Sequence, residues 1–89
     1  MKYVILDGKK MANVEKSHKY LKETLLLSDY YGENLDALWD ELSTMGEAIH
    51  IELINVSALR NNLKTYATTL IDLFNDASNE NKLIEFNTK

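Results

Sequence analysis

The 89-residue sequence contains no cysteine and no proline. Without cysteine the chain can form no disulfide and no thiolate, which excludes a disulfide-stapled fold and thiol catalysis. Its three glycines are isolated, so the sequence has no glycine-rich phosphate loop. No N-terminal segment resembles a signal peptide, and no run of about 18 apolar residues could span a bilayer. We therefore expect a soluble, cytoplasmic protein that does not enter the membrane.

Positive charge is missing from the middle of the chain. Residues 23–59 contain eight Asp or Glu and no Lys or Arg, whereas residues 1–22 carry six lysines and two acidic residues. The modest net charge of −4 does not reveal that acidic and basic residues are concentrated in different segments. A block of one sign favours a basic partner, and it disfavours nucleic acid, which needs a basic stripe. The alternative is that these acidic residues only solvate a surface.

Hydrophobic periodicity predicts an α/β fold in a single domain over residues 1–89. Short apolar or β-branched runs predict strands, and apolar positions spaced by three and four predict helices. Strands separated by long helical connections pair in parallel through right-handed crossovers. We therefore expect a three-stranded, mostly parallel sheet packed with about four helices in the order β-α-α-β-α-α-β. The predicted strands are 3–6, 48–54 and 82–86. The predicted helices run from 14 to about 27, from 35 to about 44–46, through 59–63 for a short third helix, and from about 65 to 78.

Two expectations concern individual positions within these helices. In the first helix, Val14 shares the apolar stripe with Leu21 and Leu25, and His18 lies on the same stripe. The short third helix has Asn55 or Ser57 as its candidate N-cap.

The loop and helix of residues 30–42 are the most informative stretch. Gly32 marks a turn, and Asn34 is a good N-cap because its side-chain oxygen can accept an unpaired N–H of the first helical turn. Asp36 and Asp40 lie four residues apart on one face, where two like charges slightly destabilise a helix. This small cost suggests that the pair serves a purpose other than helix formation. The apolar stripe of the same helix consists of Leu35, Leu38, Trp39 and Leu42.

Asp36 and Asp40 do not predict an acid–base enzyme. That chemistry needs two carboxyl groups across a cleft, and two residues one turn apart on an exposed helix do not form one. Asp36 has a structural explanation, because a negative charge in the first turn is favourable for the helix dipole. Asp40 lacks that explanation and is the more informative residue. Trp39 is either a core residue or a binding anchor beside the two acids.

A metal site is geometrically possible at His50 and Glu52, which point to the same side of a predicted strand. Neither His50 nor His18 has a second histidine at ligand spacing, and the chain has no cysteine. We therefore interpret both histidines as packed or surface residues and expect no cofactor. Nothing in the sequence predicts a nucleophilic catalytic arrangement, and a hydrolase remains only an alternative.

The segment Tyr30–Asp40, YYGENLDALWD, resembles the barstar family of intracellular inhibitors of barnase-type bacterial ribonucleases. A weaker similarity extends over the whole chain and includes residues 73–77. The resemblance implies a three-stranded parallel sheet with four helices and no enzymatic activity. It also implies toxin immunity as the role, a basic ribonuclease as the protein partner, and a monomer when free.

The resemblance also implies which residues contact the ribonuclease. Asp40 would be the central carboxylate, placed where a substrate phosphate would sit. Asp76 stands where the family commonly has glutamate, and Met45 stands where barstar has a tryptophan at the edge of the site. These two departures bear on partner choice, so the alternative is an immunity or binding protein of the same fold for a different basic protein or toxin. The implied contact residues are Tyr30, Gly32, Asn34, Leu35, Asp36, Trp39, Asp40 and Asp76.

Overall fold

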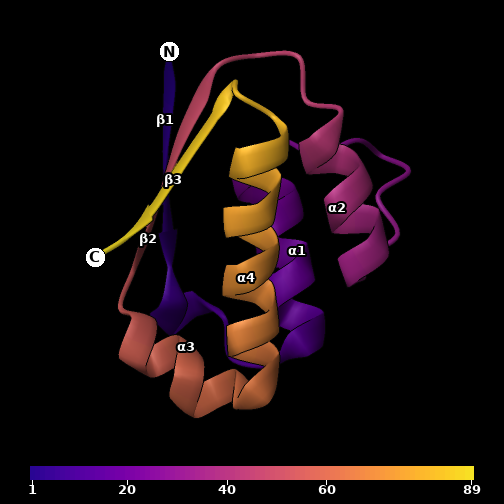
Figure 1. Ribbon diagram of the computed structural model, residues 1–89. Coiled ribbons are helices and arrows are strands. Elements are labelled where there is room, and N and C mark those ends of the chain that lie inside the picture. Colours follow the sequence, from indigo (N-terminus) through magenta and orange to yellow (C-terminus); the bar gives the residue numbers. More distant parts are fainter.

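A computed structural model describes residues 1–89 and confirms the predicted order of strands and helices (Figure 1). A short 3-10 turn, Gly8–Lys10, follows the first strand. None of the helices combines the length and the apolar character that crossing a membrane requires. The strands are β1 (Lys2–Asp7), β2 (Ile49–Ile54) and β3 (Ile84–Thr88), and the helices are α1 (Val14–Leu25), α2 (Leu35–Ser43), α3 (Val56–Leu63) and α4 (Thr65–Glu80).

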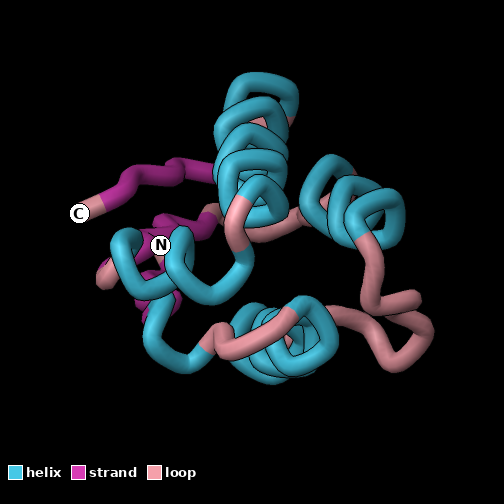
Figure 2. Tube along the Cα trace, turned by 90° about the horizontal axis from the view of Figure 1, so that it is seen from below, coloured by secondary structure: helices cyan, strands magenta, loops and turns pink.

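The three strands form one sheet in the order β1-β2-β3, and both pairs are parallel, as predicted. Helices α1, α2 and α4 lie on one side of this sheet, and α3 lies at its lower end (Figures 1 and 2). No helix covers the opposite face, where Tyr3 and Ile5 are 74% and 59% exposed. The loop between α1 and α2 lies on the side of the molecule away from the sheet (Figure 2).

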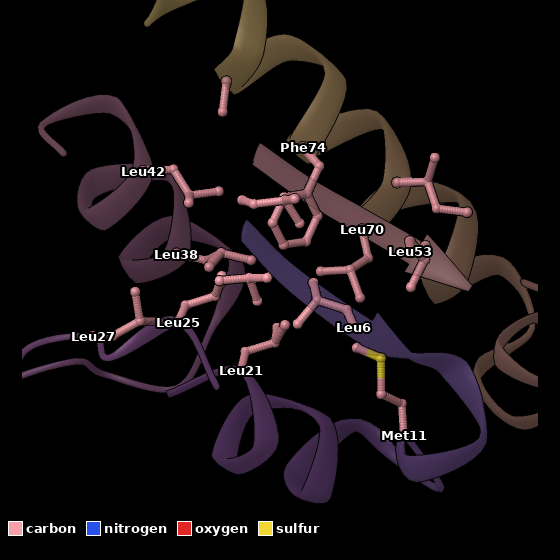
Figure 3. Close-up of a cluster of buried hydrophobic side chains, with 14 of the residues drawn as sticks. Leu6, Met11, Leu21, Leu25, Leu27, Leu38, Leu42, Leu53, Leu70 and Phe74 are labelled. Atoms are coloured by element: carbon pink, nitrogen blue, oxygen red, sulfur yellow. The ribbon is translucent and has the colours of Figure 1, made fainter. Parts of the chain in front are cut away.

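The hydrophobic core lies between the sheet and the helices that cover it. Figure 3 shows Leu38 and Leu42 of α2 in a cluster with Leu6 of β1 and Phe74 of α4. Leu38 and Leu42 have no exposed surface. Burying one leucine side chain contributes about 1.5–3 kcal/mol, so these two residues fix one face of α2 against the core. The opposite face of α2 remains free.

Three predicted boundaries near the C-terminus are wrong by two residues. Helix α4 continues to Glu80 instead of ending at Ser78. Strand β3 begins at Ile84 instead of Lys82, and it ends at Thr88 instead of Phe86. Asn81 ends the helix in an extended conformation, and its side-chain oxygen accepts a hydrogen bond from the Leu83 N–H at 3.0 Å. The turn into β3 is therefore built around Asn81.

Two expectations about helix starts are also wrong. Val14, placed on the inward stripe of α1, is 41% exposed. Asn55 precedes α3 but does not cap it with its side chain, because its backbone is left-handed with φ 55°. Its amide instead donates to Asp7 at the end of β1, at 2.8 Å. This bond, together with the Lys9 N–H, lowers the pKa of Asp7 and ties the start of α3 to the sheet.

Candidate functional site

Helix α2 begins as the sequence predicts, with Asn34 as its N-cap. The Asn34 side-chain oxygen accepts a hydrogen bond from the Ala37 N–H at 2.8 Å, and its amide donates to the Gly32 carbonyl at 3.2 Å. The turn itself differs from the prediction. The left-handed backbone lies at Glu33, with φ 55°, whereas Gly32 has no positive φ. Gly32 is exposed beside the cap and does not supply the turn geometry.

The exposed face of α2 carries two carboxylates without partners. Asp36 and Asp40 are exposed, and neither side chain forms a hydrogen bond or an ion pair within the chain. Leu35 and Trp39 are half-buried and pack against the core. Trp39 is therefore partly packed against the core, and its role as a binding anchor stays a prediction. The helix presents free acids next to an accessible indole.

The loop before α2 is held by the carboxylate of Glu41. The backbone N–H and the hydroxyl of Ser28 donate to the two oxygens of Glu41 at 2.9 and 2.7 Å. Lys19 of α1 lies 3.5 Å from Glu33 at the other end of the loop. Hydrogen bonds to a charged group are stronger than neutral ones, so Glu41 fixes the loop to the helix that follows it.

The two adjacent tyrosines of the loop point in opposite directions. Tyr30 is 97% exposed, whereas Tyr31 is only 5% exposed. The Tyr31 hydroxyl contacts Nδ1 of His18 in α1 at 2.5 Å, and Nε2 of the same histidine contacts the Tyr66 hydroxyl of α4 at 2.6 Å. Tyr31 therefore anchors the loop to α1, and His18 links this contact to α4, while Tyr30 remains exposed to solvent.

The environment of His18 favours the uncharged forms of the imidazole and of the tyrosine that it contacts. Burial lowers the pKa of His18, although the nearby Glu33 carboxylate partly opposes this effect. Burial also raises the pKa of the Tyr31 phenol, and Tyr66 and Glu33 add to the increase. A neutral imidazole has one donor and one acceptor nitrogen, and a tyrosine hydroxyl can serve either. Both hydrogen bonds of His18 are thus satisfied without charge.

Helix α4 supplies further acids beside α2. Asp76 and Asp72 are exposed, and both line a groove of about 320 Å³ whose other lining residues are Trp39, Thr69 and Leu73. The structure thus brings the predicted Asp76 to the same groove as Trp39. Asp72 was not predicted as a site residue. Its spacing of four from Asp76, which stacks the two on one helix face, was the available signal.

Met45 lies at a different place from this groove. It lines a hollow of about 250 Å³ at the C-terminal end of α2, together with Leu26 and Ile49 among others. The Asn81 amide at the end of α4 donates to the Leu42 and Met45 carbonyls at 3.0 and 2.9 Å. These bonds tie the end of α2 to the end of α4.

The two histidines lie in separate environments. His18 is buried between two tyrosines, and Nδ1 of His50 lies 3.1 Å from Glu85 on the uncovered face of the sheet. No group of three or more His, Asp or Glu side chains is arranged to hold a metal ion.

Comparison with known proteins gives matches that cover nearly the whole chain. Residues 1–88 match the family model described as Barstar (barnase inhibitor). The chain is also 36% identical over 83 residues to the Bacillus subtilis (strain 168) protein named "Putative ribonuclease inhibitor YrdF". That alignment covers 92% of this chain and 91% of the relative. Both matches span the loop, α2 and α4 described above.

Proposed function

Because the chain belongs to the barstar family, we propose that it is a ribonuclease inhibitor that acts by binding and not by catalysis. Its target is a barnase-type extracellular ribonuclease, whose basic active site it blocks. The observation that carries the proposal is the exposed face of α2, where Asp36 and Asp40 have no partner in the chain. In this role the protein is a cytoplasmic immunity protein and a monomer when free.

The acids of α2 suit this role because a ribonuclease holds cations that bind RNA phosphates. Carboxylates in the same positions form charge-assisted hydrogen bonds, and arginine can make two parallel bonds to one carboxylate. Asp40, in the second turn of α2 and beside Trp39, is the central group in this proposal. It replaces a phosphate and leaves no bond for the enzyme to cleave.

The proposed contact surface extends over the loop and α4. Tyr30 is almost fully exposed, and tyrosine is among the residues that most often dominate binding energy at protein interfaces. Gly32 keeps the loop close to the cap, since an added Cβ would lie 3.3 Å from the Asn34 amide nitrogen. The complete proposed set is Tyr30, Gly32, Asn34, Leu35, Asp36, Trp39, Asp40 and Asp76.

The internal contacts of the loop support tight binding without a change of shape. Ser28 and Glu41 hold one end of the loop, and Tyr31 holds the middle through His18. Ordering of flexible segments opposes association, and a surface that is already fixed avoids this cost. The loop and α2 therefore present their side chains in one arrangement.

Replacing Asp40 with Ala tests the proposal. We expect the variant to bind barnase at least about tenfold more weakly, because it leaves a cation of the partner buried and unpaired, at a cost of at least about 1–3 kcal/mol. The loss should come mainly from faster dissociation. Stopped-flow association and dissociation rates, together with RNA cleavage, measure both quantities.

Glu15→Ala is the matched control for this experiment. It removes the same charge from an exposed position in the first turn of α1, at the opposite end of that helix from the loop. Its dissociation rate should equal that of the wild type. If Asp40→Ala dissociates as slowly as the control, the phosphate-mimic mechanism is wrong even where inhibition is observed.

The departures at Met45 and Asp76 support a second candidate of the same type, an immunity protein for a different basic toxin. Asp76 carries its charge on a shorter stem than the glutamate common in the family, and Met45 lacks the ring of the family tryptophan. Inhibition assays against several secreted ribonucleases separate the two candidates. If none is inhibited at micromolar excess, the ribonuclease target is excluded.

A further inference from the structure

We propose that the outer edge of β1 is a docking site for an acidic, extended peptide segment of another protein, which pairs with β1 as a fourth strand. The sheet lies at the opposite side of the molecule from α2 (Figures 1 and 2). The inference therefore does not depend on the ribonuclease target. It gives a role to the lysine-rich start of the chain, which the proposed inhibitor function does not use.

The backbone groups that β1 turns away from the sheet lack partners at Tyr3 and Ile5. In a parallel pair, alternate residues direct both their N–H and their C=O to the neighbouring strand. The Lys2 N–H donates to the Ala48 carbonyl at 3.1 Å, so Lys2 and every second residue after it face β2. Tyr3 and Ile5 therefore each present one N–H and one C=O to the outside, where no further strand follows.

Asp7 shows that this outward set of groups takes a partner where one is within reach. The Asp7 N–H belongs to the same set, and the hydroxyl of Tyr20 in α1 accepts its hydrogen bond at 2.9 Å. No side chain reaches the backbone groups of Tyr3 or Ile5 in this way. The open part of the edge is thus the first half of β1.

The two edges of the sheet differ in how they are protected. Proteins usually protect an exposed edge with charged side chains, bulges or proline, because an unprotected edge pairs with other chains. Strand β3 carries Glu85 and Asn87 at exposed positions. Strand β1 instead presents Tyr3 and Ile5, both largely exposed, on the face that no helix covers. Because parallel sheets are normally covered on both faces, this edge has the features of a strand that receives a partner.

Charge complementarity selects an acidic segment. Lys2 begins β1, and Lys9 and Lys10 follow directly after its end. None of these three lysines forms an ion pair within the chain. The acid of the strand, Asp7, already accepts hydrogen bonds from the Asn55 amide and the Lys9 N–H. A segment with acids at its two ends would find cations near both ends of β1.

The acids on the open face of the sheet do not select a basic segment instead. Glu52 lies 3.7 Å from Lys89, and Glu85 lies 3.1 Å from Nδ1 of His50, so each already has a partner. They belong to β2 and β3, and neighbouring strands are about 4.8 Å apart. These acids therefore lie further from the edge than the groups of β1 itself.

The pleat of the sheet determines the side-chain pattern of the segment. Successive side chains of a fourth strand point to opposite faces. Those beside Tyr3 and Ile5 on the open face should be apolar, since cross-strand pairs of aromatic and β-branched residues stabilise a sheet. Backbone hydrogen bonds supply affinity in such strand addition, and alternate side chains supply specificity.

Amide hydrogen exchange measured by NMR tests the pairing, with a synthetic peptide in which Val and Thr alternate between two Glu at each end. In the free protein, the N–H groups of Tyr3 and Ile5 should exchange much faster than those of Val4 and Leu6. Saturating peptide should slow exchange at Tyr3 and Ile5 at least about tenfold. Slow exchange in the free protein, or binding without this protection, would overturn the proposal.

Two altered peptides separate strand pairing from simple charge attraction. A peptide with N-methyl groups on alternate amides keeps its charge but loses the donors of one edge, so it should bind at least about tenfold more weakly. A peptide with Lys in place of every Glu should also bind at least about tenfold more weakly. Equal binding of either altered peptide would contradict the proposed occupant.

Ile5→Glu places a negative charge at the edge, and Leu83→Glu is its matched control. Leu83 is also an exposed apolar residue, but it precedes β3 at the other edge of the sheet. We expect Ile5→Glu to weaken binding of the acidic peptide at least about tenfold, and Leu83→Glu to change it by less than about twofold. Equal weakening by both substitutions would mean that the peptide does not bind at β1.

The remaining outcomes distinguish other occupants and the proposed function. Sedimentation equilibrium that shows a wild-type dimer, lost in Ile5→Glu, would assign the edge to a second copy of the chain and overturn the acidic peptide. Both variants should inhibit barnase like the wild type. Peptide binding without barnase inhibition would leave the docking site intact and refute the ribonuclease target, whereas the reverse result would refute the docking site alone.

Discussion

His18 is the residue on which the position of the loop depends. It is 1% exposed and contacts the hydroxyls of Tyr31 and Tyr66 with its two ring nitrogens. Three separate segments, namely α1, the loop and α4, thus meet at one imidazole. The sequence placed His18 on the inward stripe of α1, but it could not reveal this role, because Tyr66 lies 48 residues away along the chain.

The buried state of His18 predicts a pH-dependent stability. Its pKa in the folded protein is lowered below the ordinary value of 6.5, so the unfolded chain binds the proton more readily. The free energy of unfolding should therefore be at its full value above about pH 6.5, and it should fall as the pH drops through the folded pKa. Urea denaturation at several pH values between 5 and 8 measures this change.

Two variants assign this pH dependence to its source. His18→Gln should be less stable than the wild type at pH 7.5, because it loses the contacts of the imidazole. Its free energy of unfolding should no longer show the decrease at low pH that the histidine causes. His50→Gln, on the uncovered face of the sheet, should retain the decrease. A His18→Gln protein that keeps the full decrease would show that another group is responsible.

Single residues also show which local features could be predicted. Asn34 was identified as an N-cap from its type and from the stripe that follows it, and this held because capping depends on neighbours within one turn. The left-handed backbone at Glu33 was missed because glycine normally takes that role and Gly32 stands beside it. The proposed contact residues remain predictions until binding is measured.

At the scale of elements, the loop and α2 form one unit through Glu41. The order of strands and helices and the parallel pairing followed from periodicity and connection length, which reflect the whole segment. The first and last residues of the helices and strands were predicted less well from this periodicity. The sequence predicted that α4 ends at Ser78, but the helix continues to Glu80, and Asn81 then binds the end of α2. Such long-range contacts override local preference.

Replacing Glu41 with Ala should loosen the loop. Two hydrogen bonds from Ser28 to the carboxylate are lost, and because this site is exposed we expect the free energy of unfolding to fall by only about 1 kcal/mol. Amide exchange should accelerate in residues 28–33 more than in the helices. Hydrogen exchange detected by mass spectrometry or NMR measures both.

Glu23→Ala is the control for the loop experiment. Glu23 is an exposed acid of α1 without a hydrogen bond or an ion pair in the chain, so its removal should leave exchange in the loop unchanged. Equal acceleration in both variants would mean that lost negative charge, and not the contact with Ser28, governs the loop.

At the scale of the whole molecule, charge is arranged by the fold as well as by the sequence. The block of residues 23–59, which lacks Lys and Arg, supplies the acids of α2. Asp72 and Asp76 lie outside that block, and the fold places them at the groove beside Trp39. Counting charged residues along the sequence therefore identifies only part of the acidic face. The remainder depends on the packing of α4 beside α2.

This combined acidic face predicts salt-sensitive association. The screening length shortens from about 30 Å at 0.01 M salt to about 3 Å at 1 M, so the association rate with barnase should fall steeply over this range. The dissociation rate should change much less, because contacts at the interface are shielded from solvent. Stopped-flow measurements at several salt concentrations test this, and an association rate independent of salt would contradict it.

The side chains proposed to face the partner are separate from those that hold the frame. The carboxylates of four exposed residues form no hydrogen bond or ion pair within the chain, namely those of Asp36, Asp40, Asp72 and Asp76. The side chains that hold the frame in place are those of His18, Tyr31, Glu41 and Asn81. Most substitutions at exposed, unbonded positions change stability by less than about 0.5 kcal/mol. During evolution the binding face can thus vary without bringing the fold near its stability limit. Relatives of this chain could acquire new targets by exchanging a few exposed acids while the same scaffold is retained.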